Sequence, residues 1–388
     1  MATDFSNPIV IVGGGPVGSV LALALQQNNV PFTMLEARAK GASHHDKRAL
    51  ALSYGSRIIL EKLGVWHAVE AHATTINTIH ISQRGGLGRT KLKAAEHNLP
   101  ALGYVLPYGA LTQALDEKLD MNCLEYEAEA TQIKLSEPFA QVTYNNAKTL
   151  QSALVVVADG GRSLGEIDGI KRETKEYGHD ALVTKVHAEL PHNNIAYERF
   201  TPTGPMALLP NGQDKNSCDF SLVWTGLEAN IHALAGLDDL AFLKQLHEAF
   251  GDRVGQFLTV EKRMCFPLKL STLKPATASH IAVIGNAAQT MHPVAGQGFN
   301  VGMRDAKTLA DLIINTPQTA LGSAPMLEKY SQQRSRDVKG GVLFTDLLVN
   351  TFNNDLVGLQ AIRGAGLGAL GLLKPAKSFL VGKMSFGK

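Results

Sequence analysis

The chain has 388 residues, of which 45% are hydrophobic and 19% charged, so it can bury a sizeable core in about two domains. A formal net charge of +2 without any block of like charges argues against nucleic-acid binding. The three cysteines are far apart and lack C-x-x-C spacing, which disfavours a disulfide framework or a zinc site and favours a reducing, cytoplasmic location.

The start of the chain predicts a strand, a helix and a second strand. The β-branched run Ile9–Val12 ends in glycines, and Val17–Gln27 has helical character. A turn signal at Asn28–Pro31 precedes another strand, Phe32–Glu36. This βαβ unit predicts a parallel sheet. No run reaches the roughly 18 apolar residues of a spanning helix, so we expect no membrane crossing.

The middle of the chain predicts further strands and a second layer. We expect extended chain over Thr75–Thr90, a helix over Tyr104–Leu119 and a buried strand over Leu154–Ala158. Between residues 176 and 275, extended segments alternate with turns, which predicts a mostly antiparallel layer. These segments include Ala181–Glu189, Met206–Leu209 and Phe220–Thr225.

The glycines after the first strand form a dinucleotide fingerprint. Gly13–Gly18 reads G-x-G-x-x-G between a predicted strand and helix, the context in which this pattern binds dinucleotides. Gly13 permits the tight turn, Gly15 lets the backbone approach a pyrophosphate, and Gly18 allows close packing. Pro16 and Val17 open the helix, whose free N–H groups attract phosphates.

Glu36 ends the second predicted strand and is the expected ribose ligand. Its carboxylate would accept hydrogen bonds from ribose hydroxyls and repel a 2′-phosphate, which favours FAD or NAD over NADP. The plain alternative is a glycine turn with an exposed glutamate. The fingerprint by itself does not separate FAD from NAD.

Two later motifs favour FAD. The run Val155–Ser163 begins as a predicted strand, which is followed by Asp159 and Gly160. An Asp-Gly pair after a strand, taken alone, often marks only a turn. Gly285–Asn300 follows a predicted strand at His280–Ile284 and opens a predicted helix that continues to Ile314. In this order, the three motifs resemble the fingerprints of the class A flavoprotein monooxygenases. The resemblance implies non-covalent FAD.

The third motif supplies further cofactor contacts by this resemblance. Because reduced flavin is anionic at some stage, the helix start at Gly296, Gln297 and Gly298 would offer it N–H groups and a positive dipole end. Pro293 has a fixed φ and no N–H, so it would shape the turn beside the ring. The resemblance also assigns Gly285 and Asn300 to the cofactor site. Asn286 stands where the family usually has an aspartate that binds the ribityl chain.

The flavin would carry the chemistry, and the catalytic candidates beside the ring are His292 and Pro293. His292 can equally be an ordinary turn histidine. The residue that matches Arg48 lies by the flavin in the family, although a surface arginine is the plain alternative. His44 and His45 have no helical partner at i+4, so we expect no metal site.

The resemblance implies an α/β fold with a discontinuous domain organisation. Residues 1–75, 101–175 and 276–325 would form a Rossmann-like FAD-binding domain of the para-hydroxybenzoate hydroxylase type. Residues 76–100 and 176–275 would form a mostly antiparallel substrate-binding sheet domain. Residues 326–388 would form a helical C-terminal region.

The run G-N-A-A-Q-T-x-H-P at Gly285–Pro293 resembles the branch of ubiquinone biosynthesis that hydroxylates 2-polyprenyl-6-methoxyphenols to 2-polyprenyl-6-methoxy-1,4-benzoquinols. The resemblance implies molecular oxygen as co-substrate, a flavin C4a-hydroperoxide, and NADH, NADPH or a partner reductase as electron donor. It also implies a complex with other ubiquinone-biosynthesis proteins. The alternatives are another ubiquinone precursor, a soluble phenol, or a non-catalytic flavoprotein subunit of an assembly.

The segment Asp355–Lys388 combines many apolar residues with lysines, and Asp355 is its one acidic residue. Such a segment can lie in a membrane interface, and a polyprenyl substrate resides in the bilayer. We therefore expect peripheral contact at the inner face of the membrane. The alternative is a helix packed on the enzyme's own core.

Overall fold

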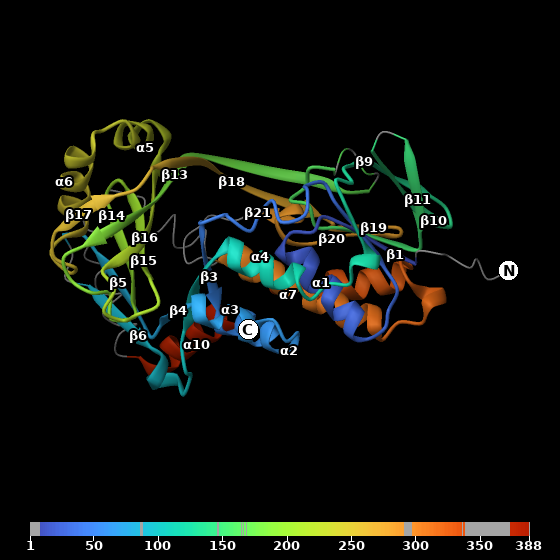
Figure 1. Ribbon diagram of the computed structural model, residues 1–388, viewed down its shortest axis with the longest axis horizontal. Helices are drawn as coiled ribbons and strands as arrows, with labels where there is room; N and C mark the ends of the chain where they lie inside the picture. Colours follow the sequence, from blue (N-terminus) through green and yellow to red (C-terminus); the bar gives the residue numbers. More distant parts are fainter. Residues whose placement is uncertain are drawn as a thin grey trace.

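The computed structural model describes residues 8–85, 88–145, 147–163, 165, 167, 169–290, 297–335, 337 and 373–387. The molecule has two halves, and the long antiparallel strands β13 (Lys171–Ala188) and β18 (Met264–Lys274) run from one half to the other (Figure 1). One half contains a parallel sheet with helices, and the other contains a large, mostly antiparallel sheet. The fold class predicted from the sequence is confirmed.

The parallel sheet has the strand order β19–β20–β12–β1–β2–β8, with only the β19–β20 pair antiparallel among these described strands. Its strands are β1 (Ile9–Val12), β2 (Thr33–Glu36), β8 (Leu124–Tyr126), β12 (Leu154–Val157), β19 (Thr277–Ala278) and β20 (Ile281–Val283). β1 and β12 are apolar at every position because both faces of this sheet are covered.

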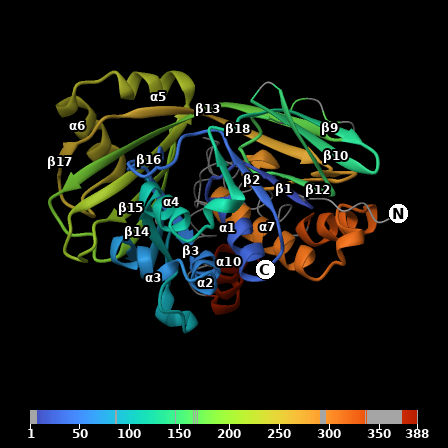
Figure 2. The same ribbon diagram turned by 45° about the vertical axis from the view of Figure 1, so that its right-hand side comes forward.

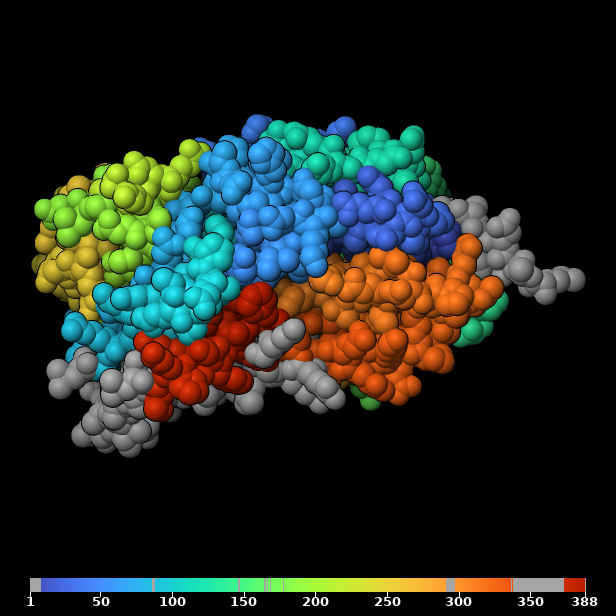
Figure 3. Space-filling view, turned by 90° about the horizontal axis from the view of Figure 1, so that it is seen from below, coloured from blue at the N-terminus to red at the C-terminus, as the bar shows by residue number. Residues whose placement is uncertain are grey.

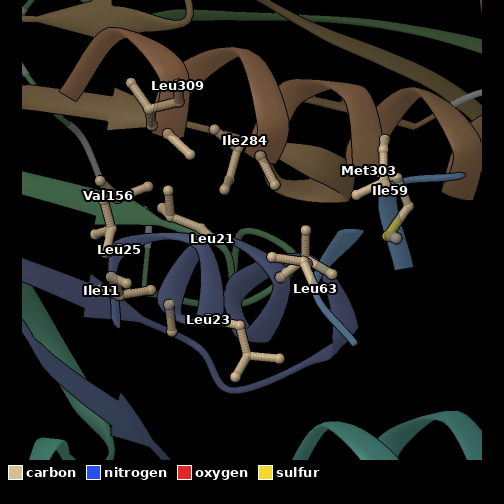
Figure 4. Packing of buried hydrophobic residues seen from close by; sticks show 14 of the residues in the cluster. Ile11, Leu21, Leu23, Leu25, Ile59, Leu63, Val156, Ile284, Met303 and Leu309 are labelled. Carbon is tan, nitrogen blue, oxygen red and sulfur yellow. The ribbon is translucent and has the colours of Figure 1, made fainter. Parts of the chain in front are cut away.

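Helices α1 (Pro16–Gln27) and α7 (Gln297–Ile314) pack on one face of the parallel sheet. Figure 4 shows Leu21 and Leu25 of α1 near Ile11 and Val156 of the sheet, below Leu309 of α7. The other face is covered by a small antiparallel sheet, which the sequence analysis did not identify. Its strands are β9 (Ala130–Ser136), β10 (Phe139–Tyr144) and β11 (Lys148–Ser152).

A second small sheet corrects one sequence prediction. We expected a helix over Tyr104–Leu119, but β7 (Gly103–Pro107) pairs with β3 (Ala49–Ser53) and β4 (Thr74–Ile76) before α4 (Tyr108–Asp116) begins. The physical reason is Pro107, which disfavours helical backbone in the residue before it and ends the strand next to the helix start.

The large sheet has the order β21–β18–β13–β16–β15–β14–β5–β6, with β17 paired to β13. β14 and β5 are parallel neighbours, while the other pairs of this order are antiparallel. Besides β13 and β18, its strands are β5 (Thr78–Gln83), β6 (Arg89–Lys93), β14 (Ile195–Thr201), β15 (Gly204–Asn211), β16 (Asp219–Leu227), β17 (Phe257–Val260) and β21 (Gln289–Thr290). Helices α5 (Glu228–Ala235) and α6 (Asp239–Phe250) cover its outer face.

The other described helices include α2 (Tyr54–Lys62), α3 (Trp66–Val69) and α10 (Lys374–Phe386), and the chain is also helical over residues 324–335. Short 3-10 helices lie at Glu70–His72, Ala94–His97, Met121–Cys123, Gly285–Ala287 and Gln318–Ala320. Figure 2 shows α10 beside α2, and the two helices are in contact. No helix in the described part of the chain has the length and apolar character that crossing a bilayer requires.

Candidate active site

Two cavities meet where the halves of the molecule join. The first, of about 330 Å³, lies at the carboxyl ends of β1, β2 and β12, and we call it the dinucleotide cavity. The second, of about 310 Å³, lies between the large sheet and the start of α7, and we call it the apolar cavity. Asn286 and Phe299 line both cavities. The carboxyl edge of a parallel sheet is the usual ligand-binding edge of such folds.

Most of the residues predicted from the sequence line one of these cavities. Those on the dinucleotide cavity are Gly13, Gly15, Pro16, Val17, Glu36, Arg48, Asp159, Gly160 and Asn286. Those on the apolar cavity are Asn286, Gln297, Gly298 and Asn300. Gly18 and Gly285 line neither cavity, and His292, Pro293 and Gly296 lie outside the described residues.

The glycines of the first motif have different physical roles. Gly13 has a φ of +108°, and a Cβ on Gly18 would lie 2.0 Å from the carbonyl oxygen of Gly13. These two positions therefore require glycine for the turn and for the packing of α1. A Cβ on Gly15 would meet only the Tyr108 hydroxyl, at 3.9 Å, so the backbone there is open to a ligand.

Glu36 is buried at the end of β2 and held by two neighbours. Its Oε2 accepts a hydrogen bond of 2.7 Å from the Gly14 N–H, and its Oε1 accepts one of 2.7 Å from Arg38 Nε. Burial raises the pKa of Glu36, but the hydrogen bonds and charge of Arg38, with the bond from Gly14, together lower it. Glu36 is therefore ionised at neutral pH and fixes the glycine turn.

Asp159 and Gly160 form a turn beside the glycine motif. Asp159 accepts hydrogen bonds from the N–H groups of Gly161 at 2.8 Å and Ser163 at 2.7 Å. Gly160 has a φ of +78°, and a Cβ built on it would meet nothing within 4 Å. The aspartate thus shapes the loop, while Gly160 leaves its backbone accessible from the cavity.

Arg48 lines the same cavity as the glycine turn. It pairs with Asp46 and stacks over the ring of Tyr108, 5.2 Å from the ring centroid. Both Arg48 and Tyr108 line the dinucleotide cavity, so the guanidinium lies where a pyrophosphate can be contacted. The sequence pattern placed Arg48 here but gave no signal for Tyr108 or for Arg38.

A buried aspartate fixes the turn at Gly285 and Asn286 through a hydrogen bond to its backbone. Asp305 of α7 accepts hydrogen bonds from the Gly285 N–H at 3.0 Å and from Gln289 Nε2 at 2.5 Å. It also forms an ion pair with Arg334, which in turn bonds Asp337. Burial of Asp305 raises its pKa, and the charge of Arg334 with these hydrogen bonds opposes that shift. No signal in the sequence pointed to Asp305.

The start of α7 faces the apolar cavity with open backbone. A Cβ on Gly298 would meet nothing within 4 Å, so a flat group can approach the backbone of this positive helix end. Asn300 holds this end in place, because its side chain accepts from Ser53 N–H at 2.8 Å and Ser56 Oγ at 2.7 Å and donates to Ala51 at 2.9 Å.

Apart from the polar groups of Ser53, Thr290, the α7 start, Asn286 and Glu198, the described lining of the apolar cavity is hydrocarbon. It comes from β3, β4, β5, β7, β14, β15 and β16, and Met384 of α10 completes the wall. Phe299 lies at its boundary with the dinucleotide cavity. Such a cavity accepts an apolar or aromatic molecule and keeps water away.

The residues present fit FAD. Open glycine backbone occurs at Gly15 and Gly160 in the dinucleotide cavity, which the ionised Glu36 also lines, and at Gly298 in the apolar cavity. This combination offers a carboxylate for a ribose, N–H groups for phosphates and a positive helix end for a flavin. The described residues contain no cluster of potential metal ligands, and His44 instead contacts Asp116 at 2.8 Å.

The chain matches the family described as FAD binding domain over residues 6–345. It is 32% identical to the ubiquinone hydroxylase UbiL of Rhodospirillum rubrum, covering 97% of this chain and 89% of that protein. It is 30% identical to the 3-demethoxyubiquinol 3-hydroxylase of Escherichia coli, covering 94% and 95%. In structure it resembles p-nitrophenol 4-monooxygenase PnpA of Pseudomonas putida, with a TM-score of 0.77, 15% identity, and coverage of 97% and 96%. The chain therefore belongs to the FAD binding domain family and is an FAD-dependent hydroxylase.

Proposed function

We propose that this FAD-dependent hydroxylase acts on the aromatic ring of a polyprenylated phenol in ubiquinone biosynthesis. The observation that carries the proposal is the contact between the two cavities at Asn286 and Phe299. A cofactor in the first cavity can present its reactive ring to an apolar molecule in the second. The names of relatives at 30% and 32% identity support the pathway.

The first candidate substrate is a 2-polyprenyl-6-methoxyphenol, and the motif Gly285–Pro293 supports it. In this phenol both ortho carbons are substituted, so the para carbon is the activated position that is open to hydroxylation. The second candidate is a demethoxyubiquinol, which the similarity to the Escherichia coli 3-demethoxyubiquinol 3-hydroxylase favours.

The chain's own residues would bind and orient. Glu36, Gly15 and Gly160 would hold the adenosine and pyrophosphate, and Asn286 with the start of α7 would hold the flavin. FAD supplies oxygen activation, with electrons from NADH or NADPH. The hydrocarbon walls of the apolar cavity would hold the substrate ring and exclude water from the reaction.

The proposal includes peripheral membrane contact through α10, the described part of the predicted C-terminal segment. Leu373 and Phe379 are 56% and 69% exposed, and Lys374 on the same short stretch is exposed as well. Figure 3 shows α10, in red, on the surface of this face of the molecule. Exposed apolar groups beside a lysine suit an anionic bilayer surface. Met384 of the same helix lines the apolar cavity, so a polyprenyl tail would have a short path from the lipid.

The test is a reconstituted assay with purified protein, FAD and NADH or NADPH. We expect a short-chain 2-prenyl-6-methoxyphenol in detergent to accelerate cofactor oxidation and to gain one oxygen atom, detected by mass spectrometry with ¹⁸O₂. A short-chain demethoxyubiquinol and a phenol without a prenyl group are tested in parallel to rank the candidates. If no phenol stimulates oxygen consumption with any donor, the protein is a non-catalytic flavoprotein and the proposal is wrong.

A further inference from the structure

Strand β14 places a carboxylate on the wall of the apolar cavity. Side chains alternate along a strand, and Ala196 and Glu198 line the cavity while Tyr197 and Arg199 lie on the other face. On that other face, Tyr197 packs against Phe250 of α6 at a ring distance of 5.4 Å, and Arg199 donates to the Ala249 carbonyl at 3.0 Å. The register therefore fixes Glu198 toward the cavity.

The residues that lie beside Glu198 in the strand pairing of the large sheet are apolar. Ala207 of β15 is its partner in the antiparallel ladder, and Val223 of β16 is the partner of Ala207. Glu198 of β14 is the one titratable side chain among the described residues that line the apolar cavity. Its carboxylate therefore borders the space that a substrate would occupy.

The opposite wall is where the flavin would lie. It consists of Asn286, Phe299 and the start of α7, so a substrate ring in this cavity lies between that wall and the large sheet. A phenol has an unperturbed pKa of about 10, so it reaches neutral enzyme with its proton attached. Its ring is far more nucleophilic once that proton leaves, and hydroxylation needs a nucleophilic ring.

We propose that Glu198 is the catalytic base that accepts the phenolic proton of the substrate. The proposal rests on the proposed function, because it requires a phenol in the apolar cavity. As the O–H bond breaks, the proton passes to the Glu198 carboxylate and the oxygen's electron pair moves into the ring. The ring carbon then bonds to one oxygen atom of O₂ and loses its own hydrogen as a proton, and the phenolic oxygen regains a proton from Glu198, which restores the aromatic ring. The other oxygen atom leaves as water, with a hydride (two electrons and one proton) from the nicotinamide donor and one further proton from solvent.

The same contact determines which carbon reacts. A phenolic oxygen held at the sheet wall directs the carbon opposite to it across the cavity, toward Asn286 and the α7 start. The carbon opposite a phenolic oxygen is the para position, which is the open one in a 2-polyprenyl-6-methoxyphenol. Glu198 is therefore both the base and a determinant of regiochemistry.

The experiment compares Glu198→Gln, Glu198→Asp and the control Glu248→Gln, which removes an exposed glutamate of α6. Each FAD-loaded protein is assayed with short-chain 2-prenyl-6-methoxyphenol for kcat, for its pH profile and for hydroxylated product per NADH or NADPH consumed. FAD affinity is measured by fluorescence titration. If Glu198 is the catalytic base, Glu198→Gln should lower kcat by about 10²–10⁴-fold.

The expected pattern is specific. Glu198→Gln should keep FAD affinity and should lose the acidic limb that the wild-type kcat profile shows as the carboxylate becomes protonated. More of its reduced flavin should yield hydrogen peroxide instead of product. Glu198→Asp should recover part of kcat together with the acidic limb, and Glu248→Gln should match wild type.

Two results would overturn the proposal while leaving the proposed function intact. Wild-type kcat and pH profile in Glu198→Gln would show that another group takes the proton. Equal loss in Glu198→Asp, with weakened FAD binding in both variants, would show a structural role. Failure of the wild-type protein to hydroxylate any phenol would instead refute the proposed function.

Discussion

At the residue scale, the clearest feature is that cofactor-site turns are held by buried acids. Glu36 fixes the glycine turn of the first motif, and Asp305 fixes the turn at Gly285. Both carboxylates accept backbone N–H groups, so each shapes the loop as well as carrying charge. Substitutions here therefore change both ligand contacts and local structure, and each needs a stability measurement beside its binding measurement.

Replacing Glu36 with Lys should weaken FAD by about 1–3 kcal/mol, because the ribose acceptor and the bond to Gly14 are both lost. FAD fluorescence titration measures this change. Glu117→Lys, at an exposed site directly after α4, makes the same charge change outside the dinucleotide cavity and serves as control. Equal FAD affinity in both variants would show that Glu36 does not bind the ribose.

Asn286→Asp should retain FAD, because both side chains offer an acceptor to the ribityl chain. Asn286→Leu should bind it more weakly, since it offers none. Flavin content after purification and a titration of the apo-protein separate the two variants. Loss of flavin in Asn286→Asp would show that the donor side of the amide is needed.

Asp305→Ala should destabilise the fold by up to about 3–5 kcal/mol, because the buried Arg334 would lose one of its two carboxylate partners and the Gly285 turn would lose its acceptor. Denaturant unfolding measures this free energy. Asp311→Ala removes an exposed acid from the same helix and should change stability little. Similar unfolding midpoints for the two variants would contradict the role assigned to Asp305.

His80 should make the protein less stable in acid. Burial, then the charge of Arg253 and neighbouring cations, lowers the pKa of His80 from 6.5 to about 4. Between these values the unfolded chain binds a proton that the folded chain does not, so folding is disfavoured as pH falls from 6.5 toward 4. His80→Phe should lose this part of the pH dependence in urea unfolding, whereas His67→Phe, at an exposed site, should keep it.

At the element scale, α10 connects the protein surface to the apolar cavity. Val381 is buried with Leu92 and Leu102, while Phe379 is directed to solvent. Lys377 lies 3.2 Å from Glu96, which ties the helix to the chain after β6. The packed-helix alternative is therefore correct for one side of α10, and the membrane proposal concerns its other side.

The double substitution Leu373→Glu and Phe379→Glu should reduce binding to vesicles that contain phosphatidylglycerol, because two apolar side chains are replaced by carboxylates, which the anionic lipid repels. FAD affinity should not change. Leu240→Glu on α6, where the leucine is 82% exposed, is the matched control and should bind vesicles as wild type does. Co-sedimentation at low salt measures the total binding to vesicles, and co-sedimentation at high salt measures the apolar part that remains when the electrostatic attraction is screened. Unaltered binding by the double variant would rule out α10 as the contact.

Elements with strong local signals were predictable, and those defined by tertiary pairing were not. β1, α1 and α7 follow from β-branched runs, glycines and helical periodicity. Residues 103–107 become a strand because β3 and β4 pair with them from distant parts of the sequence, in addition to the local effect of Pro107. Glu198 belongs to the same category, since its place on a cavity wall depends on the register of β14 with β15.

At the scale of the whole molecule, FAD should stabilise the fold, because its predicted contacts join α1, α7 and the turns after β2, β12 and β20. A ligand that binds only the folded state adds about 2.7 kcal/mol at 100 times its Kd. Thermal unfolding of apo-protein with increasing FAD should therefore show a rising midpoint, and FMN, which lacks the adenosine, should raise it less. Denatured holoprotein should release all its flavin, because the attachment is non-covalent. A fixed midpoint would argue against this cavity as the FAD site.

The strand order of the parallel sheet has a kinetic consequence. β12 ends at residue 157 and pairs with β20, which begins at residue 281, and most of the large sheet lies between them in sequence. Pairings of such long sequence separation form slowly and lengthen the time for which apolar edges stay unpaired. Until β20 pairs with it, this edge of the apolar strand β12 stays open and can pair with strands of other molecules. We expect refolding from denaturant to be slow and to yield less native protein as concentration rises, with chaperones improving the yield.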